Sequence, residues 1–166
     1  MNATLRLAMT ALCCLGAQAW AAQNLSVSFV HPENYTDASY SRLYGGERDR
    51  QSVQQAIEQH LHQLAERRLP PDRTLRIEVL DIDLAGHFEP WRHRAADVRI
   101  LRDITWPSMR LRYTLSENDQ VLANTEERLA DMHYLGSYNT YASNDRLRYE
   151  KAMLDRWFEK LAAPKR

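Results

Sequence analysis

Cysteine is nearly absent from this sequence, and the few that occur lie close to the N-terminus. They are Cys13 and Cys14, inside an apolar run that we interpret below as a removable segment. The rest of the chain has no thiol, which excludes disulfide scaffolding, thiol catalysis and cysteine-ligated zinc from it. We therefore expect the stability of the folded chain to come from a packed hydrophobic core.

Glycine is also scarce, with 5 in 166 residues. None of them forms a Gly-x-Gly-x-x-Gly or Walker loop, and no serine lies in a Gly-x-Ser-x-Gly elbow. The sequence therefore predicts neither a phosphate cradle nor a hydrolase nucleophile of that type. It calls for no cofactor.

Neither sign of charge dominates, because 22 Lys and Arg residues balance 22 Asp and Glu residues. Only residues 92–94 are locally basic, and no run of like charge is long enough to form a patch for nucleic acid or anionic lipid. We expect no nucleic-acid partner.

The N-terminus has the pattern of a secretory signal peptide. Arg6 is followed by an apolar run over residues 7–16 and then by small residues at alternate positions, of which Ala19 and Ala21 could precede a cleavage site. The run is far shorter than the roughly 20 apolar residues that a membrane-spanning helix needs. We predict a signal peptide over residues 1–21, with cleavage after Ala19 or Ala22 as alternatives to Ala21.

Two further predictions follow from this N-terminus. Cys13 follows Leu12 with Thr10 three positions before it, which is not the pattern of an acylated lipoprotein cysteine, so we expect no lipid anchor. The mature chain would be periplasmic or secreted, without a transmembrane segment, and residues 22–166 would form a single domain.

Hydrophobic periodicity predicts the first elements of that domain. Residues 25–30 alternate as a strand, and residues 33–48 form an ordered loop that Tyr35, Tyr40 and Tyr44 anchor. Apolar residues then recur every three or four positions until Pro70, which predicts an amphipathic helix over residues 50–68. His60 lies on its apolar stripe, so we expect it to contact the sheet.

The second half reads mainly as strands. Residues 74–84 alternate, but the apolar phase moves by one residue after Val79, which predicts a β-bulge. Residues 98–106 and 109–115 follow as two strands or one strand broken at Pro107. Residues 116–120 form a turn, residues 121–129 an edge strand, and an amphipathic helix follows a cap at residues 143–145.

This order, β-α-β-β-β-α, predicts an α+β fold. We expect a two-layer sandwich, in which a largely antiparallel sheet of about four or five strands has two amphipathic helices on one face.

Three segments carry a resemblance to a known family: residues 27–38 (VSFVHPENYTDA), residues 81–86 (DIDLAG) with 89–91 (EPW), and residues 147–151 (LRYEK). They resemble the bacterial exported family catalogued as domain of unknown function 3016, over essentially the whole mature chain. The resemblance implies an exported bacterial protein and transfers no catalytic residue.

The segment from residue 81 to 94 concentrates the chemically interesting side chains. Its carboxylates could bind a cation or fix a turn, and its aromatic and basic residues have the composition of a binding surface. The candidate binding residues are Asp81, Asp83, Glu89, Trp91, Arg92 and His93. The aromatic residues of the loops could instead pack on the core and hold their loops in place. They are Phe88, Trp91, Tyr134, Tyr138 and Tyr141.

Two functions of different classes fit these residues. The one we favour is a non-catalytic envelope accessory or binding protein, whose partner would be another envelope protein. The alternative is a small periplasmic metal-dependent hydrolase that uses Asp81, Asp83, Glu89 and His93. The hydrolase hypothesis requires those side chains to lie together in a cleft. The accessory-protein hypothesis predicts that they are dispersed or paired with arginines such as Arg99 and Arg102.

Overall fold

The computed structural model describes residues 24–91 and 97–163, so the predicted signal peptide, Cys13 and Cys14 lie outside the described residues. Its element order is β1 (Leu25–Phe29), a short 3-10 turn (Pro32–Asn34), α1 (Glu47–Arg68), β2 (Arg73–Asp83), β3 (His87–Phe88), β4 (Arg99–Ile100), β5 (Ser108–Glu117), β6 (Gln120–Ala130) and α2 (Arg148–Ala162). The α+β prediction is confirmed.

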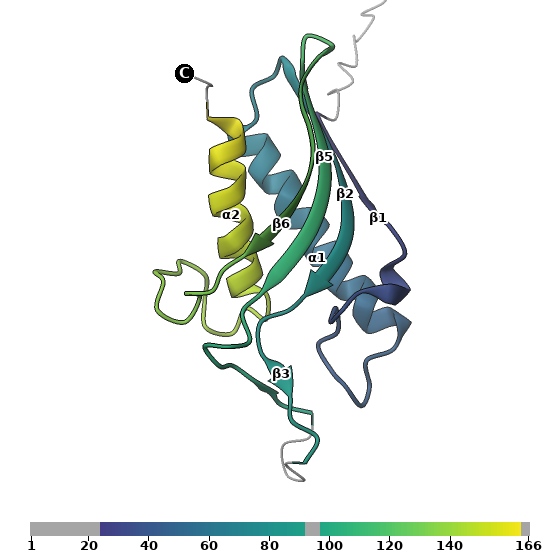
Figure 1. Cartoon of the computed structure of the whole chain (residues 1–166), viewed down its shortest axis with the longest axis vertical. Helices are drawn as coiled ribbons and strands as arrows, with labels where there is room; N and C mark the ends of the chain where they lie inside the picture. Colours follow the sequence, from purple (N-terminus) through teal and green to yellow (C-terminus); the bar gives the residue numbers. More distant parts are fainter. Residues whose placement is uncertain (1–23, 92–96, 164–166) are drawn as a thin grey trace, which may run out of the picture.

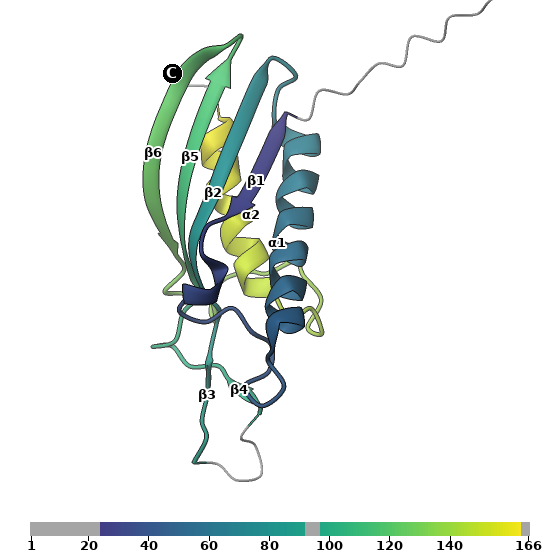
Figure 2. The same cartoon turned by 90° about the vertical axis from the view of Figure 1, so that its right-hand side faces the viewer.

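The main sheet has four strands in the order β1-β2-β5-β6, and both helices cover one of its faces (Figures 1 and 2). β2, β5 and β6 pair antiparallel, whereas β1 pairs parallel with β2 because α1 carries the chain back between them. This makes the sheet mixed. β3 and β4 form a separate two-stranded hairpin below it.

The core lies between the sheet and the helices. α1 places Val53, Ile57, Leu61 and Leu64 in it at helical spacing, and α2 adds residues that include Leu154, Trp157 and Phe158. From the sheet, Leu75, Ile77 and Val79 are buried, followed by Ile82 and Leu84. The predicted β-bulge lies between Val79 and Asp81, where the register with β5 shifts by one residue.

Three local predictions need correction. Residues 98–106 form a strand only at Arg99–Ile100, which pairs with β3 outside the main sheet. α2 begins at Arg148 with Leu147 as its N-cap, later than the cap predicted at residues 143–145, although Asp145 of that segment accepts a hydrogen bond of 2.9 Å from the Leu147 N–H. Of the three tyrosines in the first loop, Tyr35 and Tyr40 pack against the core, whereas Tyr44 is exposed.

Candidate functional site

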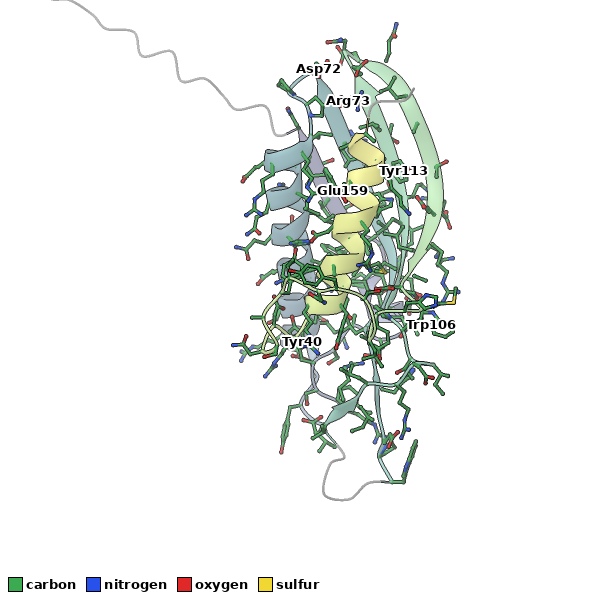
Figure 3. All side chains as sticks on the ribbon, turned by 90° about the vertical axis from the view of Figure 1, so that its left-hand side faces the viewer. Tyr40, Asp72, Arg73, Trp106, Tyr113 and Glu159 are labelled. Carbon is green, nitrogen blue, oxygen red and sulfur yellow. The ribbon has the colours of Figure 1, made fainter. Side chains whose placement is uncertain are left out.

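Most of the connecting segments gather at one end of the sheet. We call this the loop end and define it as residues 30–46, 84–91, 97–107 and 131–147; it lies below the sheet in Figures 1 and 2. Tyr40 and Trp106 are at this end in Figure 3, and Asp72 and Arg73 are at the opposite one. The described candidate residues lie here or at the adjoining end of β2, while Arg92 and His93 fall outside the described residues.

Asp81 and Asp83 occupy the sheet face that the helices leave open, since Ile82 and Leu84 beside them are buried in the core. The carboxylate of Asp81 accepts hydrogen bonds from the backbone N–H of Thr36 at 2.7 Å and from its hydroxyl at 2.9 Å. Asp81 therefore fixes the loop that follows β1, rather than the turn that follows its own strand.

Asp83 is held beside Asp37 by backbone pairing, in which Asp37 N–H donates to Ile82 and Leu84 N–H donates to Asp37. Burial raises the pKa of the Asp83 carboxyl; His87 opposes this effect, and Asp37 and Asp81 add to it. The two aspartates of β2 thus contact different neighbours in the chain: Thr36 for Asp81 and Asp37 for Asp83.

Arg99 is the main connector of the loop end. Its guanidinium forms a two-pronged ion pair with Asp37, with N–O distances of 2.8 and 2.9 Å, and it also donates to the carbonyls of Ser39 and Gly86. It lies over the Phe88 ring, 4.5 Å from the centroid. Such a bidentate, largely buried contact joins three segments that are distant in sequence.

Glu89 is buried and pairs with Arg102, whose Nε and Nη2 donate to Oε1 at 2.9 and 2.6 Å. The carbonyl of Arg102 in turn accepts a hydrogen bond from the hydroxyl of Tyr134. Glu89 therefore braces the β3–β4 hairpin against the loop that precedes α2. Trp91, two residues further on, is 69% exposed.

The hydrogen-bond partners of Asp81 and Glu89 argue against the metal-dependent hydrolase. Asp81 is engaged by Thr36 and Glu89 by Arg102, and within residues 24–91 and 97–163 no three His, Asp or Glu side chains are arranged to hold a metal ion. His93, the remaining residue of that hypothesis, lies outside the described residues. The carboxylates of Asp81 and Glu89 act as acceptors for neighbouring chain segments.

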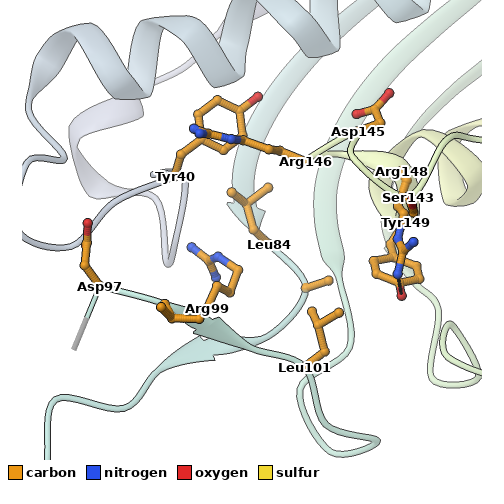
Figure 4. Close-up of a pocket in the computed structure, with 12 residues that line it drawn as sticks. Tyr40, Leu84, Asp97, Arg99, Leu101, Ser143, Asp145, Arg146, Arg148 and Tyr149 are labelled. Atoms are coloured by element: carbon orange, nitrogen blue, oxygen red, sulfur yellow. Dashed lines mark hydrogen bonds between the residues drawn. The ribbon is translucent and has the colours of Figure 1, made fainter. Parts of the chain in front are cut away.

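A pocket of about 370 Å³ opens at the loop end between the start of α2, the first loop and β4 (Figure 4). Leu84, Val98 and Leu101 supply apolar wall. Two arginines on different sides of it lie over tyrosine rings: Arg146 over Tyr40 at 5.2 Å, and Arg148 over Tyr149 at 4.4 Å from the centroids. The size is sufficient for a small organic ligand.

The acidic residues of this pocket are already engaged. Asp145 pairs with Lys151 at 2.6 Å. Asp97 accepts hydrogen bonds from the backbone N–H groups of Arg42 and Leu43 and from the Ser41 hydroxyl. The bonds from Leu43 and Ser41 are the main reason that the pKa of Asp97 falls below its ordinary value.

Exposed large hydrophobic side chains also concentrate at the loop end. In the described part of the chain only Val121, near the β5–β6 turn at the opposite end, lies elsewhere. The others are Leu43, Tyr44, Trp91, Val98, Leu101, Ile104, Met132, Leu135 and Tyr138. Gathered exposed apolar groups of this kind mark interaction surfaces.

A family model described as a protein of unknown function (DUF3016) matches residues 23–160. The chain belongs to the DUF3016 family. No curated protein and no solved structure matches it. In the described part of this DUF3016 chain, no helix is long and apolar enough to cross a membrane.

The segments that resemble the family meet in space at the loop end of this DUF3016 domain. The backbone of Asp37 forms a β-bridge with that of Asp83. The N–H of Ala85 donates a hydrogen bond of 2.7 Å to the carboxylate of the buried Glu150, in the first turn of α2. Burial raises the pKa of Glu150 to about 7, and its other oxygen, Oε2, has no hydrogen-bond partner among the described residues. Tyr134 and Tyr149 pack edge to face beside Ala85.

Sequence reasoning missed several residues of the DUF3016 site. Arg146 and Arg148 flank Leu147 at the start of the predicted helix, where basic residues oppose the helix dipole, and that unfavourable placement was the available signal. Of the loop aromatics, Tyr134 is buried, Phe88 and Tyr141 are half-buried, and Trp91 and Tyr138 are exposed. Both interpretations of these aromatics therefore apply, each to different residues.

Proposed function

We propose that this chain is exported to the periplasm or secreted after removal of residues 1–21. Its mature domain is a non-catalytic binding module that docks on another envelope protein through the loop end. The observation that carries this proposal is the gathering of exposed hydrophobic side chains at that end, with Val121 as the exception among the described residues.

The composition of the surface favours a protein partner. Trp, Tyr, Met and Arg are enriched in protein interfaces, and the loop end exposes Trp91, Tyr44, Tyr138 and Met132. Arg42 is exposed beside Leu43 and Tyr44 and has no ion-pair partner among the described residues. The partner that fits is a protein with an apolar patch bordered by acidic side chains.

The contacts that brace the loop end support binding over catalysis. Arg99 with Asp37, and Arg102 with Glu89, hold the loops in a fixed arrangement before any partner arrives. A preorganised surface loses less conformational entropy on binding than a flexible one. Glu89, which the hydrolase alternative requires, is paired with Arg102.

Site-specific photo-crosslinking in the native cell tests the proposal. A photoreactive amino acid replaces Ile104 at the loop end or, as a matched control, Val121 at the opposite end; both side chains are exposed. We expect a defined protein adduct from position 104 that is absent from position 121, and that weakens when Arg42→Glu is added. Equal adducts from both positions, adducts with lipid alone, or no adduct from position 104 would overturn the proposal.

A further inference from the structure

The pocket in Figure 4 carries positive charge that the described structure does not neutralise. Among the described residues, neither Arg146 nor Arg148 has an acidic partner, whereas the acidic side chains around them are bound by other groups. Arg99, also on the pocket wall, is committed to Asp37. Arg146 and Arg148 are thus the cations that remain for a ligand.

The position of these arginines adds to the local potential. Arg148 is the first residue of α2 and Arg146 lies two residues before it, at the helix end where unpaired backbone N–H groups carry partial positive charge. The N-cap residue Leu147 makes no side-chain cap, and the Asp145 carboxylate accepts a hydrogen bond from the Leu147 N–H. Two cations here oppose the helix dipole, and a bound anion would relieve that repulsion.

Both guanidinium groups lie over tyrosine rings in the pocket wall. An arginine that lies over an aromatic ring keeps its N–H groups, which project in the guanidinium plane, available for a carboxylate or phosphate. The hydroxyl of Tyr149 also accepts a hydrogen bond from Arg148. Figure 4 shows Arg146 with Tyr40 and Arg148 with Tyr149 at different sides of the pocket.

Part of the remaining wall is apolar. Leu84 and Ala85 are buried at its base, and Val98 and Leu101 are exposed at its edge. An inorganic anion would leave this surface uncovered, whereas a ligand with a short hydrocarbon part would cover it. The volume of about 370 Å³ accommodates such a molecule.

We infer that this pocket binds a small amphiphilic anion: a phosphate or carboxylate group held by Arg146 or by Arg148, on an apolar body that contacts Leu84, Val98 and Leu101. This inference goes beyond the proposed docking function and does not depend on it, since the pocket would bind its ligand in the isolated protein.

Calorimetric titration of the purified protein with four probes tests the inference. Hexyl phosphate and hexanoate carry both features, inorganic phosphate carries only the charge, and hexanol only the apolar part. We expect at least one of the two amphiphiles to bind about tenfold or more tightly than hexanol and than inorganic phosphate.

The double variant Arg146→Gln/Arg148→Gln should weaken that binding by about tenfold or more, because charge-assisted hydrogen bonds are lost. Arg76→Gln, an exposed arginine on the outer face of the sheet, is the matched control and should leave binding unchanged. Amide chemical-shift changes in the unmodified protein, expected near residues 84–85 and 97–101, give a second readout that needs no variant.

Several results would overturn the inference. These are binding of neither amphiphile, equal binding of hexanol, equal binding of inorganic phosphate, unchanged affinity in the double variant, or shift changes confined to other regions. Because none of these measurements involves an envelope partner, failure here leaves the docking proposal standing, and the reverse also holds.

Discussion

His60 in α1 and Asp155 in α2 are joined by a hydrogen bond of 2.9 Å between Nε2 and Oδ1. The second carboxylate oxygen of Asp155 accepts a hydrogen bond of 2.7 Å from the hydroxyl of Tyr141, and the rings of Tyr141 and His60 meet edge to face. His60 was expected to contact the sheet, but its polar partner is the neighbouring helix. This network fastens the two helices and the loop before α2 together.

Asp155→Ala should therefore lower the free energy of unfolding by about 1–3 kcal/mol, because it leaves the buried His60 without its acceptor. Urea unfolding at neutral pH measures this. Glu159→Ala on the same helix is the control: its surface ion pair with Arg68 should contribute about 0–1 kcal/mol. Equal losses in the two variants would show that the network adds nothing beyond a surface contact.

The same network predicts acid sensitivity. Burial acts to raise the pKa of Asp155, but hydrogen bonds from His60 and Tyr141 outweigh it and hold the pKa below its ordinary value. A depressed carboxyl pKa contributes stability that is present above the unfolded-state pKa and is lost as pH falls through the folded-state pKa. Tyr141→Phe should reduce this acid-dependent part of the unfolding free energy, whereas Tyr138→Phe, at an exposed tyrosine of the same loop, should not.

Because of Glu150, we expect the free energy of unfolding to fall, rather than rise, as the pH increases toward neutrality. Its pKa is raised to about 7 by burial, so the folded state holds a proton that the unfolded state has released, and stability falls as pH rises from about 4.5 to 7. Glu150→Gln, which keeps an acceptor for Ala85 N–H, should remove this fall and stabilise the protein at pH 8 by an amount of the order of 3 kcal/mol. Denaturant titrations from pH 5 to 8 on both proteins provide the comparison, and parallel pH profiles would contradict the assignment.

Trp157 predicts a large packing effect. It is 6% exposed, meets Tyr113 and Phe158 edge to face, and donates from Nε1 to Glu127 at 3.2 Å. Trp157→Ala should cost about 3–5 kcal/mol in unfolding free energy. Lys160→Ala, an exposed position one turn on, should cost far less, and a Trp157 variant that unfolds at an unchanged denaturant midpoint would refute the packing.

Export gives the remaining prediction. Mass spectrometry of the protein recovered from the periplasm or medium should find a chain that begins at or near Ala22 and carries no lipid. A mass that includes residues 1–20, or a diacylglycerol group on Cys13 or Cys14, would contradict it.

Much of the fold was accessible from the sequence because burial imposes a period on the chain. The one-residue shift between Val79 and Ile82 predicted the bulge, since a strand must turn its apolar side back toward the core after an extra residue. The apolar alternation around Val98 predicted a longer strand than the structure has. Alternation shows only that a segment could form a strand, and not that it pairs with a neighbouring strand along its length. The parallel pairing of β1 depends on the path of α1, which periodicity does not encode.

The candidate site was less accessible for a related reason. Trp91 was predicted as a binding residue because its segment concentrates charged and aromatic side chains. The pocket, however, is formed by Tyr40, Leu84, Val98 and Arg146, which come from four segments and have no common spacing. The pairing of Glu89 with Arg102 joins residues 13 positions apart through a hairpin whose existence the sequence did not indicate.

The parallel pairing of β1 has a consequence for the order of assembly. β1 is the first described element to be synthesised, yet the strand that receives it, β2, is completed only after the loop and all of α1. Until then Leu25, Val27 and Phe29 have no sheet to join, and afterwards β1 is held by a single neighbour over five residues. We expect β1 to be the last strand to dock and the first to exchange its amide hydrogens, so that β2 transiently becomes an open edge whenever β1 leaves.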